Sequence, residues 1–361
     1  MVDLSGFRKM NIYFFGNEEE KEAFLREFVF AYFSRKIPGQ YFVTREWNGG
    51  PNAEIVYYGK ALLKEETEGE IKKYCRRKKL QWTGEELAEN LGSYVKNQDN
   101  LLKMEKKDRV EILADNHLRV KDAPLDMAYY RRVYNSSEHV RLHFESRMLL
   151  QPLVEETLFK VREKKELLLF VIKLYQITMQ LFEQGEKYAG MMYYSNIAGV
   201  FGIAREYGKE EAFRRYFEAE YEKLGMEAFE EMAFLKALLC KYRAVWETIY
   251  ENSKELAEDG GLYEEGYYEL ARQEEQMKQN IKDIDSRFHQ AFLKDERLHK
   301  IVSGRIHLTF RSVVNIFYGI LPVLNLNFLD KNLCCYAIVR FTMEKYDTDW
   351  EEIMTERVIV V

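Results

Sequence analysis

The chain has 361 residues, of which 54 are Lys or Arg and 60 are Asp or Glu, so its formal net charge is -6. This length suits two or three packed units with a sizeable core. The negative charge argues against a general nucleic-acid or membrane binder, although local basic patches remain compatible with it.

The chain shows no basic segment followed by an apolar one of the kind that marks a secretory signal. Its longest apolar run, Leu167–Ile172, is far too short to span a bilayer. The four cysteines, Cys75, Cys240, Cys334 and Cys335, form neither a disulfide framework nor a CxxC metal motif. We therefore expect a cytoplasmic protein with no membrane association, no metal ion and no cofactor.

The first portion of the chain predicts a small α+β layer. Asn11–Phe15 is a short apolar run typical of a strand, and Glu18–Lys36 has apolar residues at helical spacing behind an acidic first turn. Tyr41–Gly59 then predicts a β-hairpin, because glycines at the turn Asn48–Pro51 allow the positive φ of a tight reversal. Together these segments indicate a small antiparallel sheet with a covering helix.

The remainder of the chain is predicted to become helical from Ser136 onward. Before that point, helices are expected at Glu65–Lys79 and Gly84–Val95, a strand at His117–Val120, and a proline-marked connection at Asp122–Tyr134. The helices expected after it are Ser137–Val161, Glu163–Gln184, Met191–Tyr207, Glu210–Leu224, Ala228–Ala257, Glu264–Phe292, Arg305–Leu321 and Lys331–Tyr346. The predicted class is α+β, with an α+β portion over residues 1–135 and a larger, mainly helical portion over residues 136–361 that packs on it as one compact unit.

The first hairpin strand carries a cation on an apolar face. Because side chains alternate along a strand, Arg45 and Trp47 share a face with Tyr41 and Val43. Arg45 could receive an anionic group there. Alternatively, its aliphatic stem lies along the sheet near the strand end.

A second polar feature is RRVYNSSE at Arg131–Glu138. Arg131 and Arg132 precede a helix start that Ser136 or Ser137 can cap. Free N–H groups beside arginines favour a bound carboxylate or phosphate. Ordinary capping with a surface ion pair is the alternative.

The predicted helix Arg305–Leu321 carries a polar row next to its core-facing stripe. The row consists of His307, Arg311, Asn315 and Tyr318, at steps of three and four. Such a row can line a cleft, and an imidazole with an ordinary pKa near neutrality suits proton transfer. The alternative is that the row only marks the boundary of the buried face.

Other signals are absent or ambiguous. No phosphate loop, GxGxxG, HExxH or GxSxG motif is present, which argues against nucleotide hydrolysis and dinucleotide chemistry. The basic run Lys72–Lys79 could hold an acidic peptide or an RNA backbone, or be the solvated side of a helix. His139 and His143 would share a helix face, but no third metal ligand is suggested nearby.

Three segments occur in an order that resembles a known family. They are the RxWxGGP hairpin, YRRVYNSSEHVRLHFES, and the late block IHLTFRSVVNIFYGILPVLNLNFLDKNLCCYAIVRFTME. They resemble the small C-terminal domain of lantibiotic dehydratases, whose stand-alone form is the thiopeptide-type bacteriocin biosynthesis domain. The resemblance implies tailoring of a ribosomally made precursor peptide, leader plus core. The chemistry it implies is lyase-type, either glutamate elimination from modified Ser or Thr or the joining of two dehydroalanines into a pyridine.

The resemblance also implies a single site. His307 would transfer a proton, while Arg45 with Arg131 or Arg132 would hold the anionic group. The residues expected to bind substrate around them are Trp47, Ser136, Ser137, Arg311, Asn315 and Tyr318.

One departure from the family pattern keeps the reaction open. Elimination domains usually carry an HLRLR-like strand where this chain has NAEIVYY at Asn52–Tyr58. The alternative function is therefore a non-catalytic partner that binds the precursor, or a larger dehydratase-like or tRNA-dependent enzyme, with Lys72–Lys79 meeting acidic leader residues. Direct tRNA contact through that run is disfavoured by the net negative charge.

Overall fold

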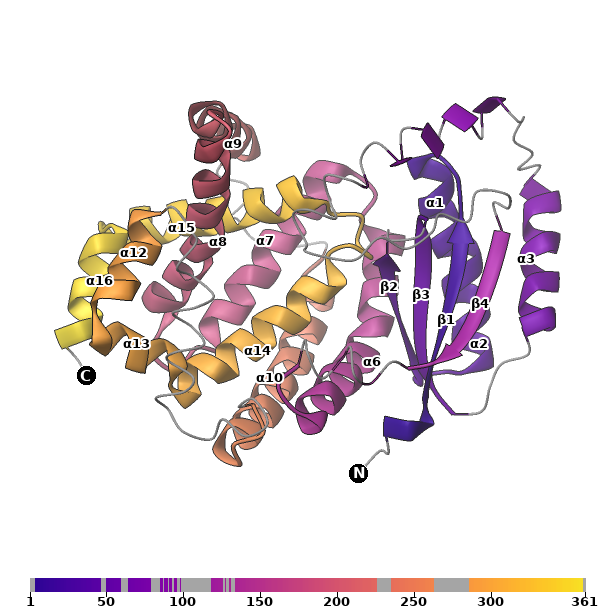
Figure 1. Cartoon of the computed structure of the whole chain (residues 1–361), viewed down its shortest axis with the longest axis horizontal. Helices are drawn as coiled ribbons and strands as arrows, with labels where there is room; N and C mark the ends of the chain where they lie inside the picture. The colour runs from indigo at the N-terminus through magenta and orange to yellow at the C-terminus, as the bar shows by residue number, and fades with distance from the viewer. Residues whose placement is uncertain are drawn as a thin grey trace. The chain divides into compact units, whose positions relative to one another are not determined.

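The computed structural model describes residues 4–46, 50–59, 64–78, 118–125, 134–225, 235–262 and 286–359, together with residues 85–86, 88–89, 91–92, 94–95, 98, 127 and 130 (Figure 1). The chain divides into two compact units. The first comprises Met1–Met127, Arg147–Phe159 and Pro322–Asn325, and the second comprises Ala128–Ser146, Lys160–Leu321 and Leu326–Val361. Two segments far along the chain thus return to the first unit. The expectation that the two portions pack as one compact unit stays a prediction.

The first unit is built on a four-stranded antiparallel sheet with the order β2-β3-β1-β4. Its strands are β1 (Phe7–Phe14), β2 (Tyr41–Glu46), β3 (Asn52–Tyr58) and β4 (Leu118–Pro124). The predicted hairpin is confirmed, and Arg45 lies opposite Ala53 in it. The predicted connection is wrong at its start, because β4 continues through Pro124. A proline is tolerated there since β4 is an edge strand and the residue ends it.

The covering helix is also confirmed, although it is not uniform. It consists of α1 (Glu18–Phe24), a π-helical segment (Leu25–Phe30) and α2 (Ala31–Lys36) without a break. Its aromatic side chains pack on the sheet, and the Phe14 and Phe24 rings stack with centroids 4.3 Å apart. Next along the chain, α3 (Lys64–Lys78) packs along β4. The described residues between 85 and 98 are helical, in line with the helix expected at Gly84–Val95.

The outer edge of β2 is closed by side chains of α6 (Ser137–Lys160) rather than by another strand. The Val43 N–H donates to Gln151 Oε1 at 2.9 Å, and Arg147 Nη2 donates to the Val43 carbonyl at 2.8 Å. The Arg147 guanidinium also lies over the Phe42 ring, 4.9 Å from its centre. These contacts satisfy both backbone groups of Val43 at a strand edge that would otherwise invite pairing with another chain.

The second unit is helical. Besides the first turns of α6 it contains α7 (Lys164–Gln180), α8 (Glu186–Glu206), α9 (Glu210–Leu224), α10 (Lys236–Glu258), α12 (Arg287–Lys294), α13 (Glu296–Ser303), α14 (Arg305–Ile320), α15 (Phe328–Tyr346) and α16 (Trp350–Ile359). The bounds of α9 are those predicted. In contrast, α8 begins at Glu186 instead of Met191, α15 begins at Phe328 instead of Lys331, and α13 and α16 were not predicted. Most of the helix expected at Glu264–Phe292, and the start of the one expected at Ala228–Ala257, lie outside the described residues.

The core of this unit fixes the rotation of α14. Phe317 of α14 packs edge-on against Tyr175 of α7 and Trp246 of α10, with ring centroids 4.6 Å and 5.7 Å apart. Phe310 and Val313 are buried on the same side. Because aromatic packing fixes this face of α14, it also fixes which way the neighbouring polar row of the helix points. No helix in the described part of the chain is long and apolar enough to cross a membrane.

Candidate functional site

The polar row predicted on α14 exists, but its members differ in exposure. Arg311 and Asn315 are exposed and Tyr318 is half-buried. His307 is only 6% exposed and packs edge-on against the Phe182 ring, with centroids 5.9 Å apart. The proton-transfer role of His307 stays a prediction, and the accessible part of the row runs from Arg311 to Tyr318.

Arg311 has no counter-ion among the residues that the structure describes, and it makes no hydrogen bond or ion pair with them. Its side chain is exposed on α14, so its charge is accessible to a ligand. Desolvation, followed by the Arg311 charge, lowers the pKa of the buried His139 to about 4. The imidazole is therefore neutral near pH 7, and its Nε2 lies 3.4 Å from Ser312 Oγ.

At the other end of the row, Tyr318 is held by polar groups of neighbouring helices. Asn196 Nδ2 of α8 donates to the Tyr318 hydroxyl at 2.9 Å. Lys331 Nζ of α15 lies 3.9 Å from the centre of the Tyr318 ring, and Cys335 Sγ lies 3.7 Å from its hydroxyl. Burial raises the pKa of Tyr318 well above its ordinary value, so the phenol stays protonated and can donate a hydrogen bond to a ligand.

Lys331 is a functional candidate that the sequence did not reveal. Desolvation lowers the pKa of its ammonium group, and no carboxylate in the described part of the chain pairs with it. The sequence shows only a lysine near a helix start. Its position over Tyr318 depends on how α14 and α15 pack, which no local pattern encodes.

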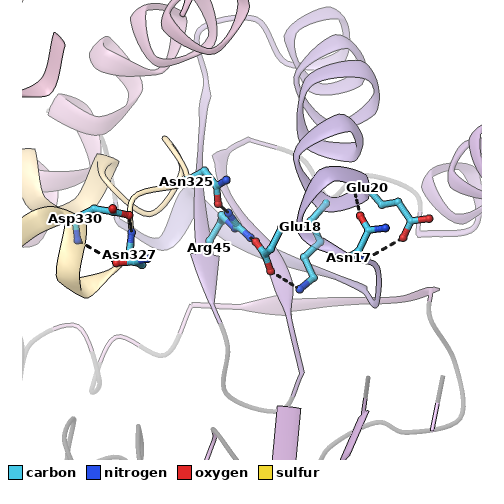
Figure 2. Close-up of polar contacts among 8 residues, drawn as sticks. Asn17, Glu18, Glu20, Arg45, Asn325, Asn327 and Asp330 are labelled. Carbon is cyan, nitrogen blue, oxygen red and sulfur yellow. Dashed lines mark hydrogen bonds and ion pairs between the residues drawn. The ribbon is translucent and has the colours of Figure 1, made fainter. Parts of the chain in front are cut away.

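Arg45 lies in the first unit and has partners. Its Nη1 donates to Asn325 Oδ1 at 2.6 Å, and its Nη2 donates to Glu18 Oε2 at 3.3 Å (Figure 2). The Arg45 side chain is 22% exposed. Asn325 adopts a left-handed backbone conformation with φ 59°, which asparagine tolerates better than most residues. Arg45 therefore joins the start of α1 to the loop Pro322–Asn325, and its place in one site with His307 stays a prediction.

The helix start predicted at RRVYNSSE is confirmed, and its cap is Ser136. The His139 N–H donates to Ser136 Oγ at 3.0 Å, while the Ser136 hydroxyl donates to the Gly261 carbonyl. Ser136 thus works as an ordinary cap, and the half-buried Ser137 follows it as the first residue of α6. The predicted site residues that lie outside the described residues are Trp47, Arg131 and Arg132.

The other sequence signals have structural explanations. In α3, Ile71, Tyr74 and Cys75 are buried, whereas Lys72, Lys73 and the following basic residues to Lys78 are exposed. The basic run is thus, over its described part, the solvated side of a helix. His139 and His143 are both buried, and no group of three His, Cys, Asp or Glu side chains within the described ranges is arranged to hold a metal ion.

Comparison with known proteins gives a fold but no family. No family model matches the chain, and no curated protein matches it. The structure of the pyridine synthase TbtD from thiomuracin biosynthesis is similar, with a TM-score of 0.62 and 16% identity over 94% of this chain and 99% of that chain. The structure of TsrL is similar with a TM-score of 0.57 and 12% identity over 95% of this chain and 96% of that chain. At these identities the likeness shows a shared fold.

Proposed function

We propose that the protein tailors a ribosomally synthesised precursor peptide by lyase-type chemistry, either eliminating glutamate from modified Ser or Thr or joining two dehydroalanines. The likeness to a pyridine synthase along nearly the whole chain supports the peptide pathway. The observation that carries the proposal is the accessible face of α14, where Arg311, which has no ion-pair partner among the described residues, lies on one line with Asn315 and Tyr318.

The chemistry needs a base, a stabiliser of negative charge and a proton donor. In glutamate elimination a base removes the Cα proton, the Cβ–O bond breaks, and the glutamyl group leaves as a carboxylate. A fixed cation such as Arg311 stabilises the charge on that group as it departs. In the cyclisation that releases the leader peptide, the departing amide needs a proton, which His307 would supply in the proposed proton-transfer role. The Tyr318 hydroxyl, held by Asn196, can donate a hydrogen bond to the departing group. The roles predicted for His307 as base and for Arg45 with Arg131 or Arg132 as anion holders remain part of this proposal.

Mass spectrometry of two candidate substrates tests the proposal. The purified protein is incubated with a glutamylated precursor and, separately, with a precursor that contains dehydroalanines. Loss of the glutamyl group supports elimination, and ring formation with leader release supports cyclisation. Arg311→Met should slow either reaction at least about tenfold, which corresponds to about 1.4 kcal/mol of transition-state stabilisation. Arg215→Met, at a side chain 75% exposed on α9, should leave the rate unchanged.

A second candidate is a non-catalytic partner that binds the precursor for a larger pathway enzyme. Two observations favour it: the Arg45 guanidinium is already bonded to Glu18 and Asn325, and His307 is largely buried. This function predicts micromolar binding of the precursor with no change in mass of either substrate. A protein that neither binds nor changes the precursor would contradict both candidates.

A further inference from the structure

Arg311 of α14 and Lys331 of α15 are two cations at the polar row of α14. Several basic side chains of the same unit lie beside carboxylates, as Arg340 does with Glu218 and Lys345 with Glu186, both at 2.6 Å. Arg311 and Lys331 have no such partner among the described residues. Arg311 is exposed, whereas Lys331 is half-buried, and desolvation of a charge without a counter-ion costs free energy at Lys331. Two accessible positive charges at one row are complementary to an anionic ligand.

The groups next to Lys331 do not neutralise it. Cys335 lies one turn further along α15, but burial raises the pKa of its thiol, so the sulfur is uncharged near pH 7. Asp330 pairs with Lys164 at 2.6 Å. It also accepts the Asn327 N–H at 2.8 Å (Figure 2). The ring of Tyr318 offers only a cation–π contact, which compensates part of the desolvation.

Geometry places the two charges at the ends of one row. Arg311 and Tyr318 are two helical turns apart on the same side of α14, which is about 10 Å along the axis. Asn315 lies between them with an exposed amide that has no partner in the described chain. Lys331 then meets the Tyr318 end of the row. We call Arg311, Asn315, Tyr318 and Lys331 the cation row, and all four belong to the second unit.

We propose that the cation row binds an acidic, extended segment of a peptide, with one carboxylate on Arg311, another on Lys331, and the backbone between them hydrogen-bonded to Asn315. An extended chain rises about 3.3 Å per residue, so the separation suits acidic side chains two to four positions apart. This inference rests on the proposed function in taking the ligand to be a peptide. Beyond the proposed function, the inference states that the bound segment is acidic and that Lys331 contributes to selecting it.

Fluorescence anisotropy with labelled model peptides tests the inference. The probes are ten-residue Gly-Ser peptides that carry two Glu residues three positions apart, a single Glu, or two Gln residues. We expect the wild-type protein to bind the two-Glu peptide at least about tenfold more tightly than the two-Gln peptide. Arg311→Met and Lys331→Met should each reduce the affinity for the two-Glu peptide at least about fivefold, with little effect on the two-Gln peptide.

Matched variants separate binding from folding. Arg215→Met and Lys209→Met remove the same charges from exposed positions on or beside α9 and should leave the affinity unchanged. Lys331→Arg keeps the charge and should retain most of the binding. Equal affinity for the Glu and Gln peptides, or equal losses in the α9 variants, would overturn the inference.

The outcome is distinguishable from that of the proposed function. A protein that modifies its precursor but shows no preference for the two-Glu peptide retains the proposed function and loses the cation row as an acidic-peptide site. Conversely, selective binding of the two-Glu peptide without binding or modification of any precursor supports the row and contradicts the precursor-tailoring function.

Discussion

The Lys331 ammonium lies 3.9 Å from the centre of the Tyr318 ring and has no carboxylate partner in the described part of the chain. The half-buried Lys331 charge lowers the stability of the unliganded protein, because no ion pair compensates the free-energy cost of its desolvation. Proteins keep such strained arrangements mainly where function requires them. The pair therefore links the folding energetics of α14 and α15 to the ligand proposed for them.

Removing the charge should stabilise the free protein. We expect Lys331→Met, which keeps the aliphatic stem, to raise the free energy of unfolding by about 1 kcal/mol and the melting temperature by about 2 °C. Lys345→Met removes an ammonium that is paired with Glu186 and should give no increase. Thermal unfolding at pH 7 without peptide measures both. A loss of stability in Lys331→Met would show that its charge is already compensated.

The contact between Arg45 and Asn325 should contribute to the stability of the first unit. A charge-assisted hydrogen bond at 2.6 Å is expected to give a coupling energy of about 1–2 kcal/mol. The double-mutant cycle uses Arg45→Met and Asn325→Gly, because glycine accepts the left-handed backbone at position 325. Urea unfolding of the four proteins gives the coupling. Additive effects of the two substitutions would mean that the contact between Arg45 and Asn325 contributes nothing to stability.

The β2 edge should depend on Gln151. Gln151→Met leaves the Val43 N–H buried without an acceptor, at a cost of about 1–3 kcal/mol. The substitution also uncovers a strand edge, so the variant should self-associate more readily. Gln40→Met, at an exposed position of the same unit, is the control and should change stability by less than about 0.5 kcal/mol. Urea unfolding and light scattering are the measurements, and an unchanged midpoint in Gln151→Met would rule out the edge contact.

Acid should weaken the second unit through its buried histidines. His289 accepts or donates a 3.0 Å hydrogen bond with Ser195 Oγ, and desolvation lowers its pKa from 6.5 to about 4. Between pH 6.5 and about pH 4, His289 binds a proton in the unfolded chain but not in the folded chain. The contribution of His289 to the free energy of unfolding is therefore complete above pH 6.5 and is lost as the pH falls toward 4. The slope is about 1.4 kcal/mol per pH unit.

The matching variant is His289→Gln, which removes this titration. Its stability should fall less between pH 7 and pH 5 than that of the wild-type protein, by about 1–2 kcal/mol, even where its absolute stability is lower. Urea unfolding at both pH values gives the difference. Identical losses in the two proteins would place the His289 pKa near its ordinary value.

Local sequence patterns predicted those features that depend on interactions between residues close together in the chain. The glycine turn between two extended runs predicted the hairpin, and the two serines after Arg131 and Arg132 predicted a cap for α6 at Ser136 or Ser137. Steps of three and four predicted the α14 row. The bounds of α9 followed from its apolar spacing. Pro124 obscured the end of β4, because proline is usual in loops as well as at strand edges.

Contacts between distant residues were beyond these patterns. Asn325 is 280 positions from Arg45, and nothing in either segment indicates the other. Lys331 reads as an ordinary surface lysine until the packing of α15 brings it over Tyr318. The burial of His307 against Phe182 likewise depends on the rotation of α14, which aromatic contacts with α7 and α10 determine.

Photo-crosslinking tests most directly whether the accessible face of α14 meets the peptide. The protein carries p-benzoylphenylalanine in place of Asn315 or, as a control, in place of the exposed Lys209, and is irradiated with the precursor peptide. We expect a crosslink from position 315 that excess unlabelled precursor suppresses, and none from position 209. No crosslink from position 315, or equal crosslinking from both positions, would contradict the proposed peptide site on α14.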